Sequence, residues 1–313
     1  MKVLIICSHK CHLPTHVAPF IQEQVEALSQ TGIECSYFLV KGKGIRGYIN
    51  ELPRLKQTIR AFRPDIIHAH YGLCGLLANL QHSVPVVTTY HGSDINEPGS
   101  RFFSLFSIVL SRHNIFVSKK LKSKVVPLRC WPNRRCTIIP CGINPCDYPL
   151  ATREEARAEL GLEDSKRYIL FAGAFDNAVK NAPLAQAAVR LLSDAELSEL
   201  KGYTRTQVAL LMRAVDSILM TSHSEGSPQV IKEALYCGCP IVSVDVGDVK
   251  EMTYGIQGCY ITDRTPAALA KALEESFRFH AYTCGKEHII DNGLDNPTIA
   301  QKITDIYAHI IQP

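Results

Sequence analysis

Short apolar runs alternate with segments of helical period along almost the whole chain, and this alternation constrains the fold more than any other feature. In segment 16–30, Val17, Phe20, Ile21 and Val25 recur at intervals of three or four residues, as on one face of a helix. Runs that are apolar throughout are typical of strands buried on both faces of a parallel sheet. We predict strands at 3–7, 33–40, 65–69, 84–88, 114–117, 168–172, 217–221, 241–245 and 259–262. We predict helices at 16–30, 183–192, 206–214, 228–237, 266–277 and 298–311. The pattern predicts an α/β chain with two doubly wound, Rossmann-like domains.

The two halves of the chain differ in charge. Residues 1–150 carry 18 Lys and Arg against 8 Asp and Glu, a net charge of +10, and residues 151–313 carry 16 against 22, a net charge of −6. Segment 140–149 contains three prolines and a glycine, a composition typical of a linker. We predict domains at 1–145 and 146–295, and a C-terminal segment, 296–313, that packs back toward the first domain.

Composition excludes several classes of protein. The 313 residues are 46% hydrophobic and 20% charged, which excludes disordered, collagen-like and disulfide-scaffold chains. No apolar stretch is long enough for a membrane span, and the apolar core of the first ten residues is too short for a signal peptide. The 12 cysteines form no Cys-X-X-Cys pair, and several lie inside apolar runs, which is typical of reduced thiols. We therefore expect a cytoplasmic protein.

One segment of the first half is strongly basic. Residues 119–135 hold seven basic side chains and no acidic one: Lys119, Lys120, Lys122, Lys124, Arg129, Arg134 and Arg135. One interpretation is a solvated surface. The other is contact with an anionic acceptor or with anionic lipid headgroups, and the second of these would make the protein peripheral at the inner face of a membrane. Nucleic acid is not predicted as a partner, because the interleaved aromatic residues of a base-stacking surface are missing.

The most informative segment is 221–235, which reads TSHSEGSPQVIKEAL. A strand ends near Thr221, a turn with a glycine follows, and Ser227 and Pro228 are a good N-cap and a good first helical residue. The amides at such a helix start favour a phosphate group. Two carboxylates, Glu225 and Glu233, flank the turn, and a carboxylate beside a sugar can accept hydrogen bonds from two hydroxyls.

The Glu225 and Glu233 pair, in the setting EGSPQVIKEALYCGCPIVSVDVGDVKE, resembles the GT-B retaining glycosyltransferases of family 4. The resemblance covers nearly the whole chain. Its other motifs are DIIHAHYG at 65–72, TYHGSD at 89–94, FVSKKL at 116–121, IIPCGI at 138–143 and FAGAFDNAVKN at 171–181. It implies a GT-B fold with two domains facing a central cleft, an acceptor in the first domain, and a nucleotide sugar of the UDP or GDP type in the second.

The resemblance implies specific roles in the donor site. Glu225 would contact the hydroxyls of the donor sugar, Glu233 would hold the ribose, and Lys180 would neutralise the pyrophosphate. The other implied donor-binding residues are Gly173, Asn181, Arg205, Gly226, Ser227, Pro228, Gln229 and Val230. Relatives carry an arginine where this chain has Ala174, so one cation is missing, and Arg205 is the candidate to replace it.

On the acceptor side, the resemblance places His91 next to the reacting sugar, as a catalytic residue together with Glu225 and Lys180. The other acceptor-side residues are His9, His12, His70 and Asp94, with Asp94 as a cap or orienting residue. His68 and His70 share one face of a strand end. They could form a metal pair, but no third ligand of fitting spacing follows.

We predict no metal and no cofactor apart from the nucleotide sugar itself. The chain contains no Asp-X-Asp sequence, the motif with which transferases of the other major fold hold a metal ion on the diphosphate. The resemblance therefore predicts a retaining, metal-independent glycosyltransferase that modifies a glycan or lipid-linked acceptor in cell-surface polysaccharide biosynthesis. Two alternatives stay open: a nucleotide-sugar epimerase on the same scaffold, and a non-catalytic relative that binds nucleotide sugars.

Overall fold

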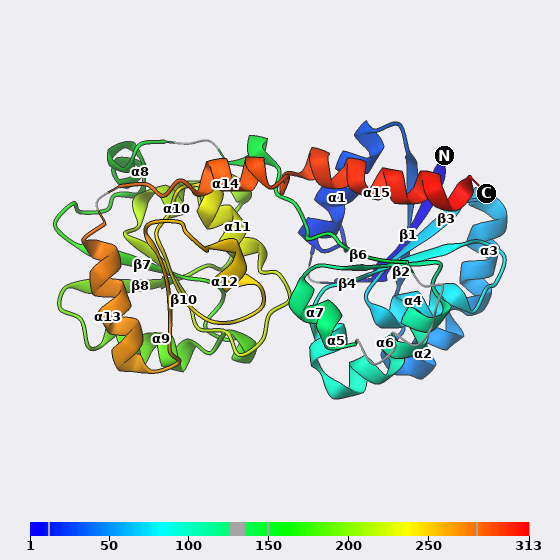
Figure 1. Cartoon of the computed structure of the whole chain (residues 1–313), viewed down its shortest axis with the longest axis horizontal. Coiled ribbons are helices and arrows are strands. Elements are labelled where there is room, and N and C mark those ends of the chain that lie inside the picture. The colour runs from blue at the N-terminus through cyan, green and yellow to red at the C-terminus, as the bar shows by residue number, and fades with distance from the viewer. Residues whose placement is uncertain (12, 126–134, 149–150, 280, 313) are drawn as a thin grey trace. The chain divides into compact units, whose positions relative to one another are not determined.

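The computed structural model describes residues 1–11, 13–125, 135–148, 151–279 and 281–312 (Figure 1). The chain divides into two compact units. Unit 1 comprises Met1–Gly142 together with Asn296–Pro313, and unit 2 comprises Ile143–Asp295. In each unit, helices cover a single parallel sheet.

The sheet of unit 1 has six strands in the order β2-β1-β3-β4-β5-β6. Their bounds are β1 (Lys2–Ser8), β2 (Glu34–Val40), β3 (Ile66–His70), β4 (Val86–Tyr90), β5 (His113–Phe116) and β6 (Arg135–Ile138). All neighbouring strands are parallel. The chain order reverses between β1 and β3, and ligands of such sheets bind outside the carboxyl ends of the strands at this reversal.

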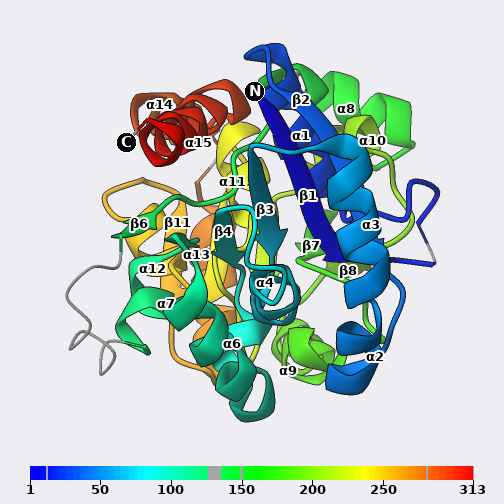
Figure 2. The ribbon, with the colours of Figure 1, turned by 90° about the vertical axis from the view of Figure 1, so that its right-hand side faces the viewer.

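Eight helices belong to the described part of unit 1. They are α1 (Pro19–Gln30), α2 (Gly44–Asn50), α3 (Leu52–Phe62), α4 (Gly72–Asn79), α5 (Ser93–Asn96), α6 (Pro98–Leu110), α7 (Lys119–Ser123) and α15 (Asn296–Ile311). Successive residues of β1 alternate between two cores. Val3 packs with α1 and α15, whereas Leu4 packs with α3 and α4. Figure 1 shows α1 and α3 on opposite sides of β1, and Figure 2 shows the same unit with α3 toward the viewer. Both faces of this sheet are therefore buried, as apolar strands require.

The sheet of unit 2 has five strands in the order β11-β10-β9-β7-β8. They are β7 (Arg167–Phe171), β8 (Ala195–Glu199), β9 (Ser217–Met220), β10 (Ile241–Val244) and β11 (Cys259–Thr262). The helices are α8 (Arg153–Leu160), α9 (Ala182–Val189), α10 (Arg205–Ala214), α11 (Gln229–Tyr236), α12 (Val249–Met252), α13 (Pro266–Phe277) and α14 (Gly285–Asp291). Short 3-10 turns lie at Pro145–Asp147 and Ala178–Lys180. Here the reversal lies between β7 and β9.

The prediction of an α/β chain with two parallel sheets is confirmed, and all nine predicted strands exist with shifts of one or two residues at their ends. The sequence analysis missed β6 and β8. Both strands lie at the edges of their sheets. In β8, Glu196 and Ser198 are exposed, so the strand lacks the apolar run by which the buried strands were found. None of the helices in the described part of the chain has the length and hydropathy that a membrane span needs.

Candidate functional site

Two loops meet at the point where the strand order of unit 2 reverses. The loop after β7 carries Gly173 and Lys180, and the loop after β9 carries Glu225. The two loops are joined by the Thr221 hydroxyl, whose Oγ1 lies 2.9 Å from the Lys180 carbonyl oxygen, and by the His223 amide, which donates to the Val179 carbonyl at 2.9 Å. This edge of the sheet therefore brings the predicted donor-binding segments together.

Lys180 and Glu225 form an ion pair at this edge. Nζ of Lys180 lies 2.8 Å from Oε1 of Glu225, and the two side chains are 20% and 16% exposed. Gly173 makes room for the lysine, because a Cβ at this position would lie 2.7 Å from Cγ of Lys180. Asn181, the next residue, has φ of 58°, and its side-chain amide donates to the Thr221 carbonyl at 3.4 Å. The lysine side chain is thus held against the carboxylate that the sequence analysis assigns to the donor sugar.

A second ion pair joins Arg205 to Glu233. Nη1 of Arg205, the first residue of α10, donates to Oε1 of Glu233 in α11. The Glu233 side chain is only 4% exposed, and a buried carboxylate without a partner would be strongly unfavourable. Arg205 is therefore paired with the carboxylate assigned to the ribose. Ala174, which follows Gly173 directly, is half-buried.

The start of α11 differs from the prediction. The helix begins at Gln229, its N-cap is Pro228 in an extended conformation, and no side chain caps it. The prediction that Ser227 is the N-cap and Pro228 the first helical residue is therefore wrong. Pro228 has a ψ of 122° and therefore lies outside the helix, at the N-cap position. Ser227 lies one residue before the N-cap, too far from the first turn to cap it. Gly226 is buried in the turn, and Val230 packs against the core of unit 2.

Three side chains around this turn were not predicted from the sequence. Arg264, just after β11, donates from Nη1 to the carbonyls of Thr221 and Ser222 at 2.9 and 2.8 Å. Lys232 is fully buried in α11 and lies 3.4 Å from Oε1 of Gln229. Burial raises the pKa of Asp248, and the positive charge of Lys232 opposes that shift. Arg264 could have been found by its position after a strand, but a buried lysine leaves no sequence signal.

The corresponding edge of unit 1 gathers imidazole rings. His70 ends β3, and His91 follows β4. Nδ1 of His70 lies 3.0 Å from Nε2 of His91, and Nδ1 of His91 lies 3.7 Å from Sγ of Cys141. Tyr71 has φ of 73°, a conformation that costs a tyrosine about 1–3 kcal/mol, and its ring lies 4.8 Å from that of His91. Cys141 was not predicted, because it follows the strand β6 that the sequence analysis missed.

Asp94 holds the backbone of the His91 turn. Its Oδ1 accepts hydrogen bonds from the amides of His91 and Gly92, at 3.1 and 2.8 Å. Gly92 has φ of 144°, which favours glycine, and it is the N-cap of α5, so Asp94 orients this turn from inside the helix. The Asp94 carboxyl is buried, and burial raises its pKa to about 6.

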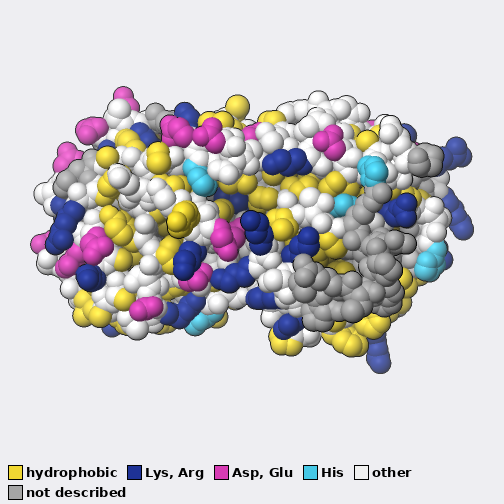
Figure 3. All heavy atoms as spheres, viewed as in Figure 1, with side chains coloured by type: hydrophobic (Ala, Val, Ile, Leu, Met, Phe, Trp, Pro, Cys, Tyr) yellow, Lys and Arg dark blue, Asp and Glu magenta, His cyan; other side chains and the backbone are white. Residues whose placement is uncertain are grey.

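Of the remaining acceptor-side residues predicted in unit 1, the structure describes His9. His9 follows β1 and stacks on His16, with ring centroids 4.4 Å apart. His12 lies outside the described residues, as do Arg129 and Arg134 of the basic segment. Arg135 begins β6. On the face shown in Figure 3, most acidic side chains lie on unit 2, as its negative charge requires.

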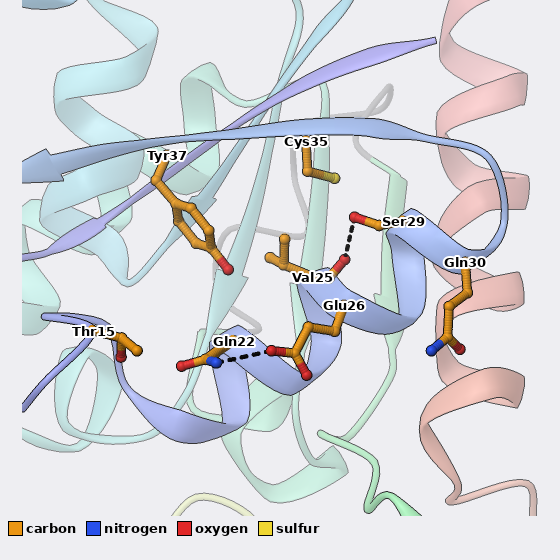
Figure 4. Close-up of a pocket in the computed structure, with 8 residues that line it drawn as sticks. All are labelled: Thr15, Gln22, Val25, Glu26, Ser29, Gln30, Cys35 and Tyr37. Carbon is orange, nitrogen blue, oxygen red and sulfur yellow. Dashed lines mark hydrogen bonds between the residues drawn. The ribbon is translucent and has the colours of Figure 1, made fainter.

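A groove of about 530 Å³ lies on unit 1 between α1 and β2 (Figure 4). It is lined by Thr15, Gln22, Val25, Glu26, Ser29, Gln30, Cys35 and Tyr37. None of the predicted site residues is among them. Within the described residues, no three His, Cys, Asp or Glu side chains are arranged to hold a metal ion. His68 instead contacts Thr89 and Tyr307 through its two ring nitrogens.

Two protein families match the chain. Glycosyltransferase Family 4 matches residues 9–146, and Glycosyl transferases group 1 matches residues 163–278. The putative teichuronic acid biosynthesis glycosyltransferase TuaC of Bacillus subtilis is 29% identical over 250 residues, which are 71% of this chain and 63% of that protein. D-inositol 3-phosphate glycosyltransferase of Mycolicibacterium gilvum is 25% identical, over 71% of this chain and 60% of that protein. The matched region is thus less than two thirds of the length of these relatives.

Solved structures show the same fold. Sucrose-phosphate synthase of Thermosynechococcus elongatus has a TM-score of 0.84 at 15% identity and covers 99% of this chain and 98% of that one. HepE of Anabaena in complex with UDP has a TM-score of 0.75 at 15% identity, over 99% of this chain and 100% of that one. UDP-GlcNAc 2-epimerase of Methanocaldococcus jannaschii has a TM-score of 0.63 at 13% identity, over 99% and 100%. The chain has the GT-B fold and belongs to the group 1 glycosyltransferases of family 4.

Proposed function

We propose that this protein transfers a sugar from a nucleotide-sugar donor to a glycan or lipid-linked acceptor. The proposal rests on two ion pairs at the carboxyl edge of unit 2. Lys180 is paired with Glu225, and Arg205 is paired with Glu233. Each carboxylate of the Glu-X7-Glu motif is held by a cation from a neighbouring loop or helix. This arrangement suits a ligand with hydroxyl groups and a diphosphate, and the fold relative HepE is described in complex with UDP-glucose.

Lys180 and Glu225 are neighbours, as the groups that bind the two sides of the breaking bond must be. A nucleotide sugar joins its sugar to its diphosphate through one oxygen, so the groups that bind the two parts must be neighbours. Nζ of Lys180 lies 2.8 Å from Oε1 of Glu225. When the bond breaks, negative charge develops on the departing diphosphate, and the Lys180 ammonium stabilises that charge. Glu225 meanwhile orients the sugar by accepting hydrogen bonds from its hydroxyls.

We propose a reaction without a metal ion and with retention of the anomeric configuration. Lys180 and the amides at the start of α11 supply the positive potential near the diphosphate. Because Arg205 is engaged with Glu233, we assign it to the nucleoside end of the donor. The acceptor would attack on the face from which the diphosphate leaves, and that diphosphate would take the acceptor proton. Nuclear magnetic resonance of the product sugar would show an inverted anomeric centre if retention is wrong.

The test of the function is a panel of nucleotide sugars, with and without acceptor and with a metal chelator. We expect slow hydrolysis of one donor without acceptor, faster consumption with acceptor, and no effect of the chelator. Glu225→Ala should abolish both reactions. Donor epimerised without acceptor would show an epimerase, and binding without turnover of any donor would show a non-catalytic relative.

We propose that the acceptor belongs to cell-surface polysaccharide biosynthesis and that the protein works in the cytoplasm at the inner face of the membrane. TuaC, a putative teichuronic acid biosynthesis enzyme, is among its relatives. In α6, three large apolar side chains spaced four residues apart are exposed on one helix face: Phe102 at 57%, Phe106 at 48% and Leu110 at 47%. Such a stripe beside basic residues is typical of a helix that lies on an anionic bilayer.

Basic side chains accompany the apolar stripe of α6. Arg101 lies in α6, and Lys120 and Lys124 lie in or just after α7. Burial lowers the pKa of Lys124, and so do the nearby positive charges of Arg101 and Lys120. These three positive charges therefore lie close together, and one of them, Arg101, precedes Phe102 in the same helix. They favour anionic lipid headgroups.

Vesicle sedimentation tests the membrane proposal. We expect binding to vesicles that contain phosphatidylglycerol, little binding to pure phosphatidylcholine, and weaker binding at high salt. The double variant Phe102→Ser/Phe106→Ser should bind less. Tyr254→Ser, which changes an exposed aromatic residue of unit 2, is the matched control and should bind as the wild type does. Equal binding to both vesicle types at any salt concentration would contradict the proposal.

A further inference from the structure

A row of rings leads through unit 1 to the carboxyl edge of its sheet. The Tyr307 hydroxyl, from α15, contacts Nδ1 of His68, and the Thr89 hydroxyl lies 2.7 Å from Nε2. The His68 ring stacks on that of His70 at 4.6 Å, with 20° between the planes. The His91 ring lies 5.2 Å from that of His70, with 21° between the planes. The positions of three successive imidazole rings are therefore fixed by contacts within the unit.

His70 carries one proton on its ring. It is fully buried, and burial, together with the charge of His91, lowers its pKa well below the ordinary value. Nδ1 of this neutral ring lies 3.0 Å from Nε2 of His91. Nε2 of His70 is buried and has no hydrogen-bond partner among the described residues.

These contacts decide where the proton lies. A proton on Nε2 of His70 would leave a buried N–H without an acceptor, and such orphaned donors are rare in folded proteins. A proton on Nδ1 instead makes a hydrogen bond to Nε2 of His91. Nε2 of His91 then accepts, so a neutral His91 must carry its own proton on Nδ1.

We infer that His70 is a positioning residue that keeps the His91 proton on Nδ1, so that His91 meets its ligand as a hydrogen-bond donor and not as a base. The inference deepens the proposed function and rests on it for the nature of the ligand. While the hydrogen bond from His70 lasts, the Nε2 lone pair of His91 is occupied. His91 can then exchange the contact of its Nδ1 with Sγ of Cys141, 3.7 Å away, for a hydrogen bond donated to an oxygen of a sugar hydroxyl or a phosphate, but it cannot take a proton from the acceptor.

The surroundings of His91 support a fixed ring. The Phe20 ring lies 5.0 Å from it and the Tyr71 ring 4.8 Å, both tilted against it. Its backbone amide is held by Asp94, and its Nδ1 lies on the side of Cys141. Packing thus fixes the plane of the ring, whereas His70 fixes which nitrogen carries the proton. Substituting His70 should change which nitrogen of His91 carries the proton, while the plane of the His91 ring stays fixed.

Two variants of similar shape separate these properties. His70→Asn places a side-chain amide near the position of Nδ1 and can still donate to His91, whereas His70→Leu is of similar size and cannot. Long-range proton–nitrogen correlation spectra of imidazole-labelled protein report which ring nitrogen is protonated, and His91→Phe assigns the His91 signals by their loss. We expect His91 to be protonated on Nδ1 in the wild type and in His70→Asn, and to lose this preference in His70→Leu.

Turnover should follow the same order. The kcat of His70→Leu should fall about 10-fold to 100-fold, the range typical when a partner that orients a metal-ligating histidine is lost, with KM little changed, and His70→Asn should recover most of it. A wild-type spectrum with the proton on Nε2, or with an imidazolium at neutral pH, would overturn the inference, as would an unchanged tautomer in His70→Leu. The spectra need no donor. Failure of the proposed function would appear instead as a wild-type protein that neither binds nor turns over any nucleotide sugar.

Discussion

The two units place different chemistry on the same scaffold. Both sheets have the same order about the reversal, with the first strand of each unit next to its second and third. At the carboxyl edge of unit 2 the functional side chains are charged and form ion pairs, such as Lys180 with Glu225. At the carboxyl edge of unit 1 they are imidazoles, and burial keeps His68 and His70 neutral. The shared topology therefore positions a site without determining its electrostatics.

Because one edge is charged and the other mostly neutral, the two edges should respond differently to substitution. Removing one member of an ion pair leaves its partner as an uncompensated charge, so unit 2 should respond through charge. Unit 1 should respond through hydrogen bonding and pH, because its polar groups are buried and mostly neutral. Variants at the two edges separate these two responses.

Of the variants that separate the two edges, Lys180→Ala should have the largest effect. Loss of the ammonium that we propose to stabilise the departing diphosphate should lower kcat about 100-fold to 1000-fold. The measurement is donor turnover with acceptor. Lys201→Ala is the matched control, because Lys201 also pairs with a carboxylate of unit 2, Asp176 at 2.6 Å, but at an exposed position. Equal rates in the two variants would remove Lys180 from the mechanism.

The second effect is a pH dependence of stability from Asp94. Its carboxyl keeps a proton up to about pH 6 in the folded state, whereas the unfolded chain releases it near pH 4. The folded protein binds more protons within this window, so the free energy of unfolding should fall as the pH rises through it, by about 2–3 kcal/mol. Asp94→Asn should lack this fall.

Urea unfolding of both proteins from pH 4 to pH 7 measures the Asp94 contribution. Buried His68 and His70 produce a slope of opposite sign, because their pKa values are lowered on folding and stability rises with pH until they are neutral in both states. The difference between the variant and the wild type therefore isolates Asp94. A difference that is constant with pH would contradict the raised pKa.

A third effect concerns the Arg205 pair. Arg205→Ala leaves the Glu233 carboxylate buried without its cation, so the free energy of unfolding should fall by about 1–3 kcal/mol. Adding Glu233→Gln should restore part of it, since the second change removes the unpaired charge. Denaturant midpoints of the two single variants and the double variant measure the coupling. Additive losses would show that the pair contributes nothing.

The smallest effect is expected for Ser227→Ala. Because Ser227 does not cap α11, its loss should change the free energy of unfolding by less than about 0.5 kcal/mol. Thr204→Ala is the positive control, because Thr204 forms a capping box with Gln207 at the start of α10, and its loss should cost about 1 kcal/mol. If both variants lose the same stability, Ser227 has a structural role after all.

Elements that are buried on both faces were predicted, because burial leaves an apolar pattern in the sequence. Edge strands and side-chain pairings were missed, because they depend on contacts between residues far apart in the chain. Central strands such as β1 are apolar on both faces and were found, whereas the edge strands β6 and β8 were not. In the site, the resemblance singled out Glu225, Glu233 and Lys180, but not the pairing of Arg205 with Glu233. Tyr307 is 239 residues from His68 along the chain, and no local pattern links them.

A crystal structure with a bound nucleotide sugar tests the central claim most directly. The account predicts that a phosphate oxygen replaces the Glu225 carboxylate at Nζ of Lys180, and that Glu225 accepts hydrogen bonds from the sugar hydroxyls. It also predicts that Glu233 contacts the ribose. A nucleotide sugar bound elsewhere, with Lys180 and Glu225 still paired at 2.8 Å, would contradict it.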